Sequence, residues 1–372
     1  MIRGPGDDFE IVPVRLRPIG DDEIRVRIVA TGMCHTDLMV RDGHIPPVPM
    51  PAILGHEGAG VIEEVGSAVT DLAMGDHVVL SFAFCGHCGH CTDGRPSDCD
   101  QFFVANFLDC EAQVQAAGID DPVNGGFFNQ SSFATHSIVK ARHAVPVAKD
   151  LPLDLLAPLG CGIITGAGTV LNHMRAGKGS SIAVVGAGAV GLSAVMAARI
   201  ARCSTIVAVD RNKDRLRLAK ELGATHTFVP DETDVPAAIR ALVPTGADFV
   251  LDTTGVPTVV AQALGIANRR GSVVLVAGTP TDEIVLNMSA LLSGASIQMV
   301  AEGASVPREF IPQLIGYYRE GRFPFDRLIR FYDFHDINAA ARDSIAGTAI
   351  KPVLRMPGPN STPISSSKQG SS

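Results

Sequence analysis

The chain has 372 residues, of which 46% are hydrophobic and 19% charged, with 38 glycines. Two domains are expected at this length, because single cores rarely grow beyond about 250 to 300 residues. The composition excludes a disordered or coiled-coil protein. The formal net charge of -8 and the lack of a Lys/Arg run argue against a nucleic-acid partner and favour a small-molecule one.

The N-terminus has charged residues and no apolar stretch, so we expect no signal peptide and a cytoplasmic protein. A charge-free segment, residues 179–198, meets the length criterion for a membrane helix. Its glycines are spaced as in a phosphate-binding turn, and Arg199 follows it at once. A buried strand and helix is therefore the preferred interpretation, and we expect no membrane contact.

The first part of the chain, to about residue 160, contains short strand-like runs broken by glycine and proline, such as residues 24–30 and 75–81. This pattern predicts an irregular β lobe. From Ser181 strands and helices alternate, which predicts an α/β lobe with a parallel, doubly wound sheet. Its strands are expected at 182–185, 205–209, 249–251 and 273–276, and its helices from Ala189 and over 213–222.

After residue 301 the alternation stops, and a helix near 307–318 leads to a last strand near 350–354. We expect this segment to return to the first lobe. From Pro357 onward the chain has little to bury, which predicts a disordered tail. The expected parts are residues 1–163, the α/β lobe 164–301, the returning segment 302–356 and the tail 357–372.

Four cysteines, Cys85, Cys88, Cys91 and Cys99, follow one another with two, two and seven residues between them. Glycines in the run allow the backbone to curl around one tetrahedral ion, and four thiolates leave no open position for substrate. The run therefore predicts a structural zinc site. The alternatives are an iron–sulfur cluster and free or redox-active thiols, the latter with a regulatory role.

The other cysteines and histidines near this run have plainer interpretations. Eight cysteines are too few for a disulfide scaffold in a chain of this size, which favours metal binding in a reducing compartment. His87 and His90 are expected to be bystanders, and Cys110 and Cys203 to be ordinary buried thiols.

A glycine-rich turn follows the apolar strand at 182–185 and opens a helix. The acidic Asp210 ends the next strand, where it can accept hydrogen bonds from ribose hydroxyls. Such a turn lets a pyrophosphate approach the helix N-terminus, so we predict a dinucleotide site rather than a merely tight turn. The turn consists of Gly186, Ala187, Gly188, Ala189, Val190 and Gly191.

The residue after that strand also bears on the choice of cofactor. The carboxylate of Asp210 would repel the 2′-phosphate of NADP, which favours NAD. Arg211 and Arg215 lie beside it in the sequence and would partly offset that repulsion.

Three further potential metal ligands are scattered: Cys34 in Gly-Met-Cys-His-Thr-Asp, His56 in Gly-His-Glu, and Cys161 in Leu-Gly-Cys-Gly-Ile-Ile-Thr-Gly. Spacing alone does not join them, and each taken singly is a buried thiol or a core histidine. Together with the cysteine run and the glycine-rich turn, however, these strings resemble, along nearly the whole chain, the zinc-containing medium-chain alcohol dehydrogenases.

This resemblance implies a fold and a metal site. The fold is a GroES-like irregular β catalytic domain joined to a Rossmann domain that binds NAD. Cys34, His56 and Cys161 match the three ligands of a catalytic zinc whose fourth position is open. Glu57 matches a nearby acidic residue that can approach the metal, and Asp37 matches a carboxylate that orients the ligand histidine.

The resemblance also implies cofactor and substrate contacts. Thr165 matches a nicotinamide contact, Lys351 a pyrophosphate contact and Phe82 a position lining the substrate pocket, although a phenylalanine is more often core. His35 matches a pyrophosphate contact that could share in proton transfer. The remaining cofactor contacts are expected at Thr253, Val276, Ala277 and Gly278.

The implied mechanism is hydride transfer from an alcohol to NAD, with zinc as the Lewis acid that lowers the pKa of the alcohol. The proton would leave through the hydroxyl of Thr36. Two departures from the family are visible. Met39 stands where many relatives have a proton-shuttling histidine, and the residues before Phe9 are too few for the usual first strand.

Residues 128–134 and 323–332 make the benzyl alcohol dehydrogenases the nearest group within the family, as relatedness signals without chemistry of their own. A benzyl or other aryl alcohol is therefore expected, with allylic, terpene or aliphatic alcohols, or a thiol–aldehyde adduct, as alternatives. A polyol is disfavoured because Cys161 retains sulfur where polyol enzymes usually have a carboxylate. A non-catalytic NAD-binding structural protein is the remote alternative. Relatives imply a homodimer or homotetramer.

Overall fold

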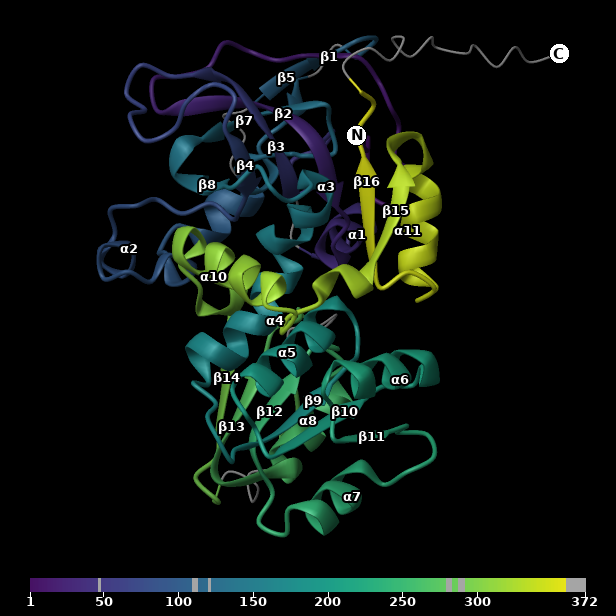
Figure 1. The fold of residues 1–372 in the computed structure, drawn as a ribbon. Coiled ribbons are helices and arrows are strands. Elements are labelled where there is room, and N and C mark those ends of the chain that lie inside the picture. The colour runs from purple at the N-terminus through teal and green to yellow at the C-terminus, as the bar shows by residue number, and fades with distance from the viewer. Residues whose placement is uncertain (46–47, 109–112, 120–121, 279–282, 287–291, 359–372) are drawn as a thin grey trace, which may run out of the picture.

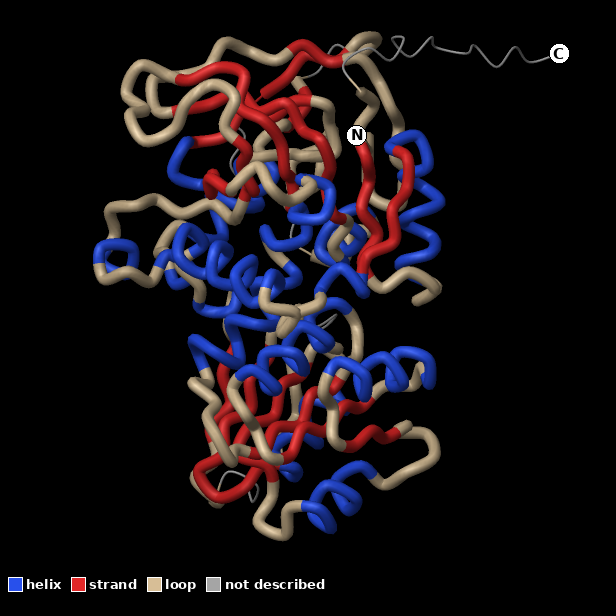
Figure 2. The backbone as a smooth tube through the Cα atoms, in the orientation of Figure 1, coloured by secondary structure: helices blue, strands red, loops and turns tan. Residues whose placement is uncertain are grey.

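The computed structural model describes residues 1–45, 48–108, 113–119, 122–278, 283–286 and 292–358. Its strands form two groups at opposite ends of the molecule, with helices between them (Figure 2). The strands β9 to β14 lie at one end and the remaining strands at the other (Figure 1). Cys110 and the predicted tail from residue 359 onward lie outside the described residues.

The first group of strands forms a seven-stranded sheet and a small three-stranded sheet. The larger sheet has the order β15-β16-β2-β3-β4-β8, and β7 pairs with β2 outside this path. Its strands are β2 (Glu23–Gly32), β3 (Glu57–Val65), β4 (His77–Leu80), β7 (His136–Lys140), β8 (Ala144–Val147), β15 (Ile329–Asp333) and β16 (Lys351–Arg355). The smaller sheet consists of β1 (Val14–Arg15), β5 (Gln113–Ala116) and β6 (Val123–Asn124).

The returning segment after residue 301 joins this first group. β16 pairs antiparallel with β2 and parallel with β15, so the end of the chain extends a sheet that begins more than three hundred residues earlier. The helix that leads to it, α10 (Pro307–Arg319), and α11 (Ile337–Ile345) belong to the same segment. β1 has two residues and begins at Val14, so the expectation about the residues before Phe9 stays a prediction.

The second group is a six-stranded sheet in which every pairing between neighbours is parallel, in the order β11-β10-β9-β12-β13-β14. This order is that of a doubly wound Rossmann sheet. The strands are β9 (Ser181–Val185), β10 (Thr205–Val209), β11 (His226–Phe228), β12 (Ala247–Asp252), β13 (Ala267–Leu275) and β14 (Ser296–Met299). The predicted α/β alternation is therefore confirmed.

Helices cover both faces of this sheet. The side chains of β9 point alternately to the two faces, so each face contributes to a separate core. Ile182 and Val184 belong to the core that includes α5 (Ala189–Ile200) and α6 (Lys213–Leu222). Ala183 and Val185 belong to the core that includes α7 (Val235–Leu242) and α8 (Pro257–Ile266).

The remaining helices lie in the first lobe or between the lobes. The α-helices are α1 (His35–Arg41), α2 (Gly89–Thr92), α3 (Leu153–Leu156) and α4 (Gly162–Gly168). The short 3-10 and π segments are η1 (Pro96–Asp98), η2 (Val104–Leu108), η3 (Phe127–Asn129), η4 (Ala141–His143), η5 (Ala157–Gly160), η6 (Thr169–His173), η7 (Glu302–Ala304), η8 (Phe325–Leu328) and η9 (Phe334–Asp336).

The charge-free segment at residues 179–198 forms β9 and most of α5, as expected from its glycine spacing. Within the described residues no single helix is long and apolar enough to cross a membrane. The helical stretches Leu153–Gly160 and Gly162–His173 meet the criterion only when taken together, and they are bent by 57° at Cys161.

Candidate active site

Three potential metal ligands that are far apart in the sequence meet beside α4. Cys34 is the residue before α1, His56 immediately precedes β3, and Cys161 lies between η5 and α4. One ligand atom of each lies within 4.8 Å of the other two, and all three residues are buried. The fold therefore brings together the three residues that sequence spacing could not join.

The orientation of His56 fits a metal ligand. Its Nδ1 lies 2.9 Å from Oδ1 of Asp37. Oδ1 also accepts a hydrogen bond from the backbone N–H of Gly55, and Oδ2 accepts one from that of Cys34. The other ring nitrogen, Nε2, is buried and has no hydrogen-bond partner among the described residues. Two thiols and one imidazole nitrogen with a fourth position left open are the donor set of a catalytic zinc, so these residues fit that ion.

The thiols of Cys34 and Cys161 shift each other's pKa. Their mutual interaction is the largest cause that lowers the pKa of Cys34 well below its ordinary value and raises the pKa of Cys161. Burial opposes the charged form of His56, but Asp37 and Cys34 outweigh it and raise its pKa. The site thus concentrates negative charge on sulfur next to an imidazole, as a metal cation requires.

The four-cysteine run folds into a loop around α2 that protrudes from the side of the molecule (Figure 1). The sulfur atoms of four cysteines all lie within 4.8 Å of one another: Cys85, Cys88, Cys91 and Cys99. Backbone N–H groups of His87 and Cys88 point at the sulfur of Cys85, at 3.4 and 3.3 Å. A closed set of four sulfurs fits the predicted structural zinc.

The glycine-rich turn lies between β9 and α5, at the carboxyl end of the parallel sheet. Gly186 has a φ of 96°, and a Cβ on Gly191 would approach the carbonyl oxygen of Gly186 to 1.8 Å. No heavy atom lies within 4 Å of the Cβ position of Gly188, the residue before α5, and no side chain caps that helix. The N-terminus of α5 is therefore open to an anionic group such as pyrophosphate.

The carboxylate of Asp210 lies at this turn. Its Oδ2 accepts a 2.7 Å hydrogen bond from the backbone N–H of Ala187, and its Oδ1 accepts one from Asn212. Arg211 is directed to Asp231 instead, and Arg215 donates to the carbonyl oxygen of Gly347. The two predicted arginines thus have protein partners, and the expected contact of Asp210 with a ribose stays a prediction.

Two family models match this chain. The alcohol dehydrogenase GroES-like domain matches residues 20–149, and the zinc-binding dehydrogenase model matches residues 189–316. Together they cover more than half of the chain. The chain belongs to the zinc-dependent medium-chain alcohol dehydrogenases.

Relatives and solved structures agree with this assignment. The chain is 45% identical over 363 residues to geraniol dehydrogenase of Castellaniella defragrans, covering 95% of this chain and 96% of that one. Its fold matches a zinc-binding alcohol dehydrogenase domain protein from Burkholderia ambifaria with a TM-score of 0.92 and 49% identity, over 95% and 97% of the two chains. It matches benzyl alcohol dehydrogenase of Acinetobacter calcoaceticus with a TM-score of 0.91 and 43% identity, over 95% and 98%.

In this alcohol dehydrogenase Glu57, expected near the metal, and Lys351, expected at the pyrophosphate, form an ion pair with each other. Nζ of Lys351 lies 2.8 and 3.0 Å from the carboxylate oxygens of Glu57, which also accepts from the N–H of Gly162. Burial raises the pKa of Glu57, and the ammonium group offsets only part of that rise. Both predicted contacts would require this buried ion pair to break, so they remain predictions.

A second carboxylate at the metal site was not predicted. The buried Glu302 has Oε1 3.5 Å from the sulfur of Cys161, and its Oε2 accepts a 3.4 Å hydrogen bond from the hydroxyl of Thr165. Burial raises the pKa of Glu302 to about 7. Thr165, expected at the nicotinamide, is thus connected to the metal site through this residue.

Phenylalanines pack against the ligand histidine. The ring of Phe128 stacks on His56 with centroids 4.4 Å apart, and Phe127 meets it edge-on at 5.5 Å. The side chain of Gln130 donates to the carbonyl oxygen of His56 and accepts from the N–H of Gly58. Residues 128–134, interpreted from the sequence as a relatedness signal, thus also help to position the ligand histidine.

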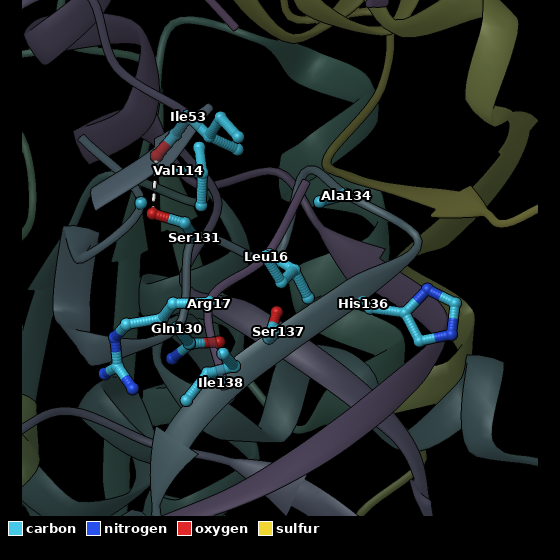
Figure 3. A pocket seen from close by; sticks show the side chains of 11 residues that line it. Leu16, Arg17, Ile53, Val114, Gln130, Ser131, Ala134, His136, Ser137 and Ile138 are labelled. Carbon is cyan, nitrogen blue, oxygen red and sulfur yellow. Dashed lines mark hydrogen bonds between the residues drawn. The ribbon is translucent and has the colours of Figure 1, made fainter. Parts of the chain in front are cut away.

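The same string lines a small cavity of about 20 Å³ near β7 (Figure 3). Ser131 donates to the carbonyl oxygen of Ile53 there, and the buried hydroxyl of Ser137 has no partner in the described part of the chain. The cavity has room for about one water molecule, so it is not a substrate pocket.

Phe82 and the proton-path residues lie in different surroundings. Phe82 is 1% exposed and packs near Phe84 and Phe102, so its predicted pocket role stays a prediction.

The hydroxyl of Thr36 lies 3.6 Å from the sulfur of Cys34, and the neighbouring His35 is exposed. A hydroxyl beside the metal site, with an exposed imidazole next in sequence, is thus present as expected.

The remaining predicted cofactor positions follow the ends of parallel strands. Thr253 follows β12 and donates its hydroxyl to the carbonyl oxygen of Val185, next to the glycine-rich turn. Gly278 approaches Met39 of the first lobe, whose Cε lies 3.8 Å from its Cβ position. The positions that follow β13 are Val276, Ala277 and Gly278. They lie at the same edge of the sheet as the turn, where such folds bind nucleotides.

Proposed function

We propose that this alcohol dehydrogenase oxidises primary alcohols whose carbinol carbon is bonded to an sp² carbon, and produces the conjugated aldehyde. Geraniol and benzyl alcohol, named in two relatives, share this feature, one as an allylic and the other as a benzylic alcohol. The benzyl preference expected from the sequence and its terpene alternative thus have one reactive group in common.

The observation that carries this proposal is the row of aromatic rings beside the metal ligand. Phe128 stacks on His56, and the ring of Phe107 meets Phe128 edge-on with centroids 5.1 Å apart. Aromatic faces and edges pair favourably with other flat π systems, by about 0.5 to 1.5 kcal/mol beyond simple burial. We therefore propose that the substrate packs against these rings, which we call the aromatic wall. A planar ring or alkene next to the carbinol carbon would pack there better than a flexible saturated chain.

The chain's own residues would hold the reactants and move the proton. When bound, zinc supplies a Lewis acid and NAD supplies the hydride acceptor. Cys34, His56 and Cys161 would hold the zinc, and the hydroxyl of Thr36 would take the alcohol proton. From Thr36 the proton would pass to solvent through His35 or the cofactor ribose, because Met39 cannot carry it.

We further propose NAD as the cofactor, because the carboxylate of Asp210 would repel the phosphate of NADP. We place the domain boundaries near residues 163, 301 and 356. We also propose that the chain forms a homodimer or homotetramer through the nucleotide-binding domain. The free thiols at both metal sites support a reducing compartment, the cytoplasm.

Matched pairs of alcohols test the substrate class. We would measure kcat/KM with geraniol against citronellol, which lacks the double bond next to the carbinol carbon, and with benzyl alcohol against cyclohexylmethanol. The unsaturated member of each pair is expected to be better by about tenfold or more, which is about 1.4 kcal/mol in the transition state. Equal values within both pairs would contradict the proposal.

A variant connects the preference to the aromatic wall. Phe128→Leu keeps an apolar side chain but removes the ring, so the preference within each pair should shrink. Phe331→Leu removes an exposed ring on β15 and serves as the matched control. The ratio of kcat/KM for benzyl alcohol to that for geraniol in the unaltered enzyme decides between a preference for aryl alcohols and one for terpene alcohols.

A further inference from the structure

Two carboxylates lie at the catalytic metal site, and they differ in how firmly they are held. Glu57 receives two hydrogen bonds from the ammonium group of Lys351 and one from Gly162, all between 2.8 and 3.0 Å. Removing one partner from a buried ion pair is strongly destabilising, because the other charge is left uncompensated. Moving Glu57 to the metal would leave Lys351 in that state.

Glu302 has only weak contacts. Its oxygens lie 3.5 Å from the sulfur of Cys161 and 3.4 Å from the hydroxyl of Thr165, which are long for hydrogen bonds. Within the described part of the chain Glu302 forms no ion pair, because the ammonium group of Lys351 engages Glu57. A carboxylate that is 7% exposed and has no ion-pair partner among the described residues favours a nearby cation strongly.

The backbone holds Glu302 in this position. Glu302, Gly303 and Ala304 all have φ values between 48 and 64°, in the left-handed region that is unfavourable for an L-residue. A Cβ on Gly303 would lie 2.6 Å from the carbonyl oxygen of Ile164, so η7 packs directly on α4. This close packing presses the side chain of Glu302 against the helix that begins after Cys161.

The distance between Glu302 and Cys161 suits coordination of a shared ion. In a tetrahedral zinc site with bonds of about 2.3 Å to sulfur and about 2.0 Å to oxygen, the two ligand atoms lie about 3.5 Å apart. Oε1 of Glu302 lies 3.5 Å from the sulfur of Cys161. Glu302 is not in the group of atoms within 4.8 Å of one another, so it reaches the open position by rotating its side chain.

We propose that Glu302, and not Glu57, is the carboxylate that binds the catalytic zinc at its fourth position when no alcohol is present, and that it cedes this position to the substrate. The other three ligands are the two sulfurs and the buried Nε2 of His56, which has no hydrogen-bond partner in the part of the chain that the structure describes. The hydroxyl of Thr165, which donates to Oε2 of Glu302, competes with the metal for this carboxylate. The proposal holds for any alcohol substrate.

Cobalt spectroscopy without cofactor or substrate tests this assignment. The catalytic zinc is replaced by Co(II), and the visible spectrum and the affinity for azide, a probe for the open position, are measured. In E302Q the cobalt bands should shift, and azide should bind about tenfold more tightly because no carboxylate competes. In T165V, which removes only the restraining hydroxyl, azide should bind more weakly than in the unaltered protein.

E57Q is the matched control, since it makes the same change in the other carboxylate and should leave the cobalt bands in place. Retention of the structural zinc and an unchanged melting temperature show that each variant is folded. Identical bands and azide affinities within twofold in E302Q and the unaltered protein would overturn the proposal. A shift in E57Q instead of E302Q would overturn it as well, by assigning the role to Glu57.

Discussion

Oδ1 of Asp37 lies 2.9 Å from Nδ1 of His56, and both side chains are fully buried. The other carboxylate oxygen of Asp37 accepts from the N–H of Cys34, so one residue fixes two of the three catalytic metal ligands. This arrangement leaves only Nε2 of His56 available for the ion and orients it before the ion arrives.

Asp37→Asn should weaken the catalytic zinc site. An amide offers one acceptor oxygen where the carboxylate offers two, so the hydrogen bonds to His56, Cys34 and Gly55 cannot all be kept. The affinity for the catalytic zinc is expected to fall about 10- to 100-fold, as for other residues that orient metal ligands. Competition with a chelator measures this affinity. The structural zinc is the internal control, and an unchanged catalytic affinity would contradict the assigned role.

Cys91→Ser should remove the structural zinc and leave the catalytic one. The sulfur of Cys91 lies 3.9 Å from that of Cys85 within the four-sulfur group. Structural zinc contributes directly to folding stability, so the melting temperature should fall while one zinc per chain remains. Cys203→Ser, at a half-buried cysteine outside both metal groups, should keep two zincs. Two zincs in the Cys91 variant would exclude the structural assignment.

Asp210→Asn should relax the choice between NAD and NADP. The amide keeps an acceptor oxygen for the N–H of Ala187 but removes the negative charge near the expected 2′-phosphate. The ratio of kcat/KM for NADP to that for NAD should rise about tenfold, since about 1.4 kcal/mol is a realistic repulsion between charges at this kind of distance. Asp214→Asn, an exposed charge on α6, should not change the ratio. A constant ratio in both variants would refute a role for Asp210 in cofactor choice.

His143 should make the protein less stable in acid. Its Nδ1 lies 2.9 Å from Oδ1 of Asn129, its Nε2 accepts the N–H of Phe84, and burial is the main cause that lowers its pKa to about 3. In the unfolded chain His143 takes up a proton near pH 6.5, whereas in the folded protein it stays neutral down to about pH 3. The folding free energy that the neutral histidine contributes is therefore fully present above about pH 6.5 and is lost as the pH falls toward about 3. The loss is at most about 5 kcal/mol.

The variant His143→Gln isolates this effect, because the zinc ligands are the same in both proteins. Its denaturation midpoint should depend less steeply on pH between about 6.5 and 3 than that of the unaltered protein. His335→Gln, at an exposed histidine, is the control and should follow the unaltered curve. Parallel curves for all three proteins would show that His143 does not set the acid limit.

Features that depend on neighbouring residues were predictable from the sequence. Residues 213–222 form a helix as expected, with Asn212 accepting from the N–H groups of Asp214 and Arg215 and Gly223 following the last turn. The glycine-rich turn was predictable for the same reason, since Gly186 and Gly191 meet within a few residues of one another. Periodicity and turn chemistry act over such short distances.

Contacts between distant segments were not predictable from local patterns. Cys34, His56 and Cys161 were joined only through a family resemblance, because nothing in their spacing brings β3 and α4 together. Glu302 was missed because a left-handed backbone, stabilised by packing of η7 on α4, directs its side chain inward. The pairing of Lys351 with Glu57 likewise depends on β16 adding to the sheet beside β2.

The zinc content of the purified chain, measured together with reduction of NAD by benzyl alcohol and geraniol, tests the central claim most directly. We predict two zincs per chain and turnover of at least one of these alcohols, with Cys161→Ala retaining one zinc and no turnover. One zinc or none in the unaltered chain would contradict the assignment of Cys34, His56 and Cys161. Two zincs without turnover of either alcohol would contradict the proposed substrate class.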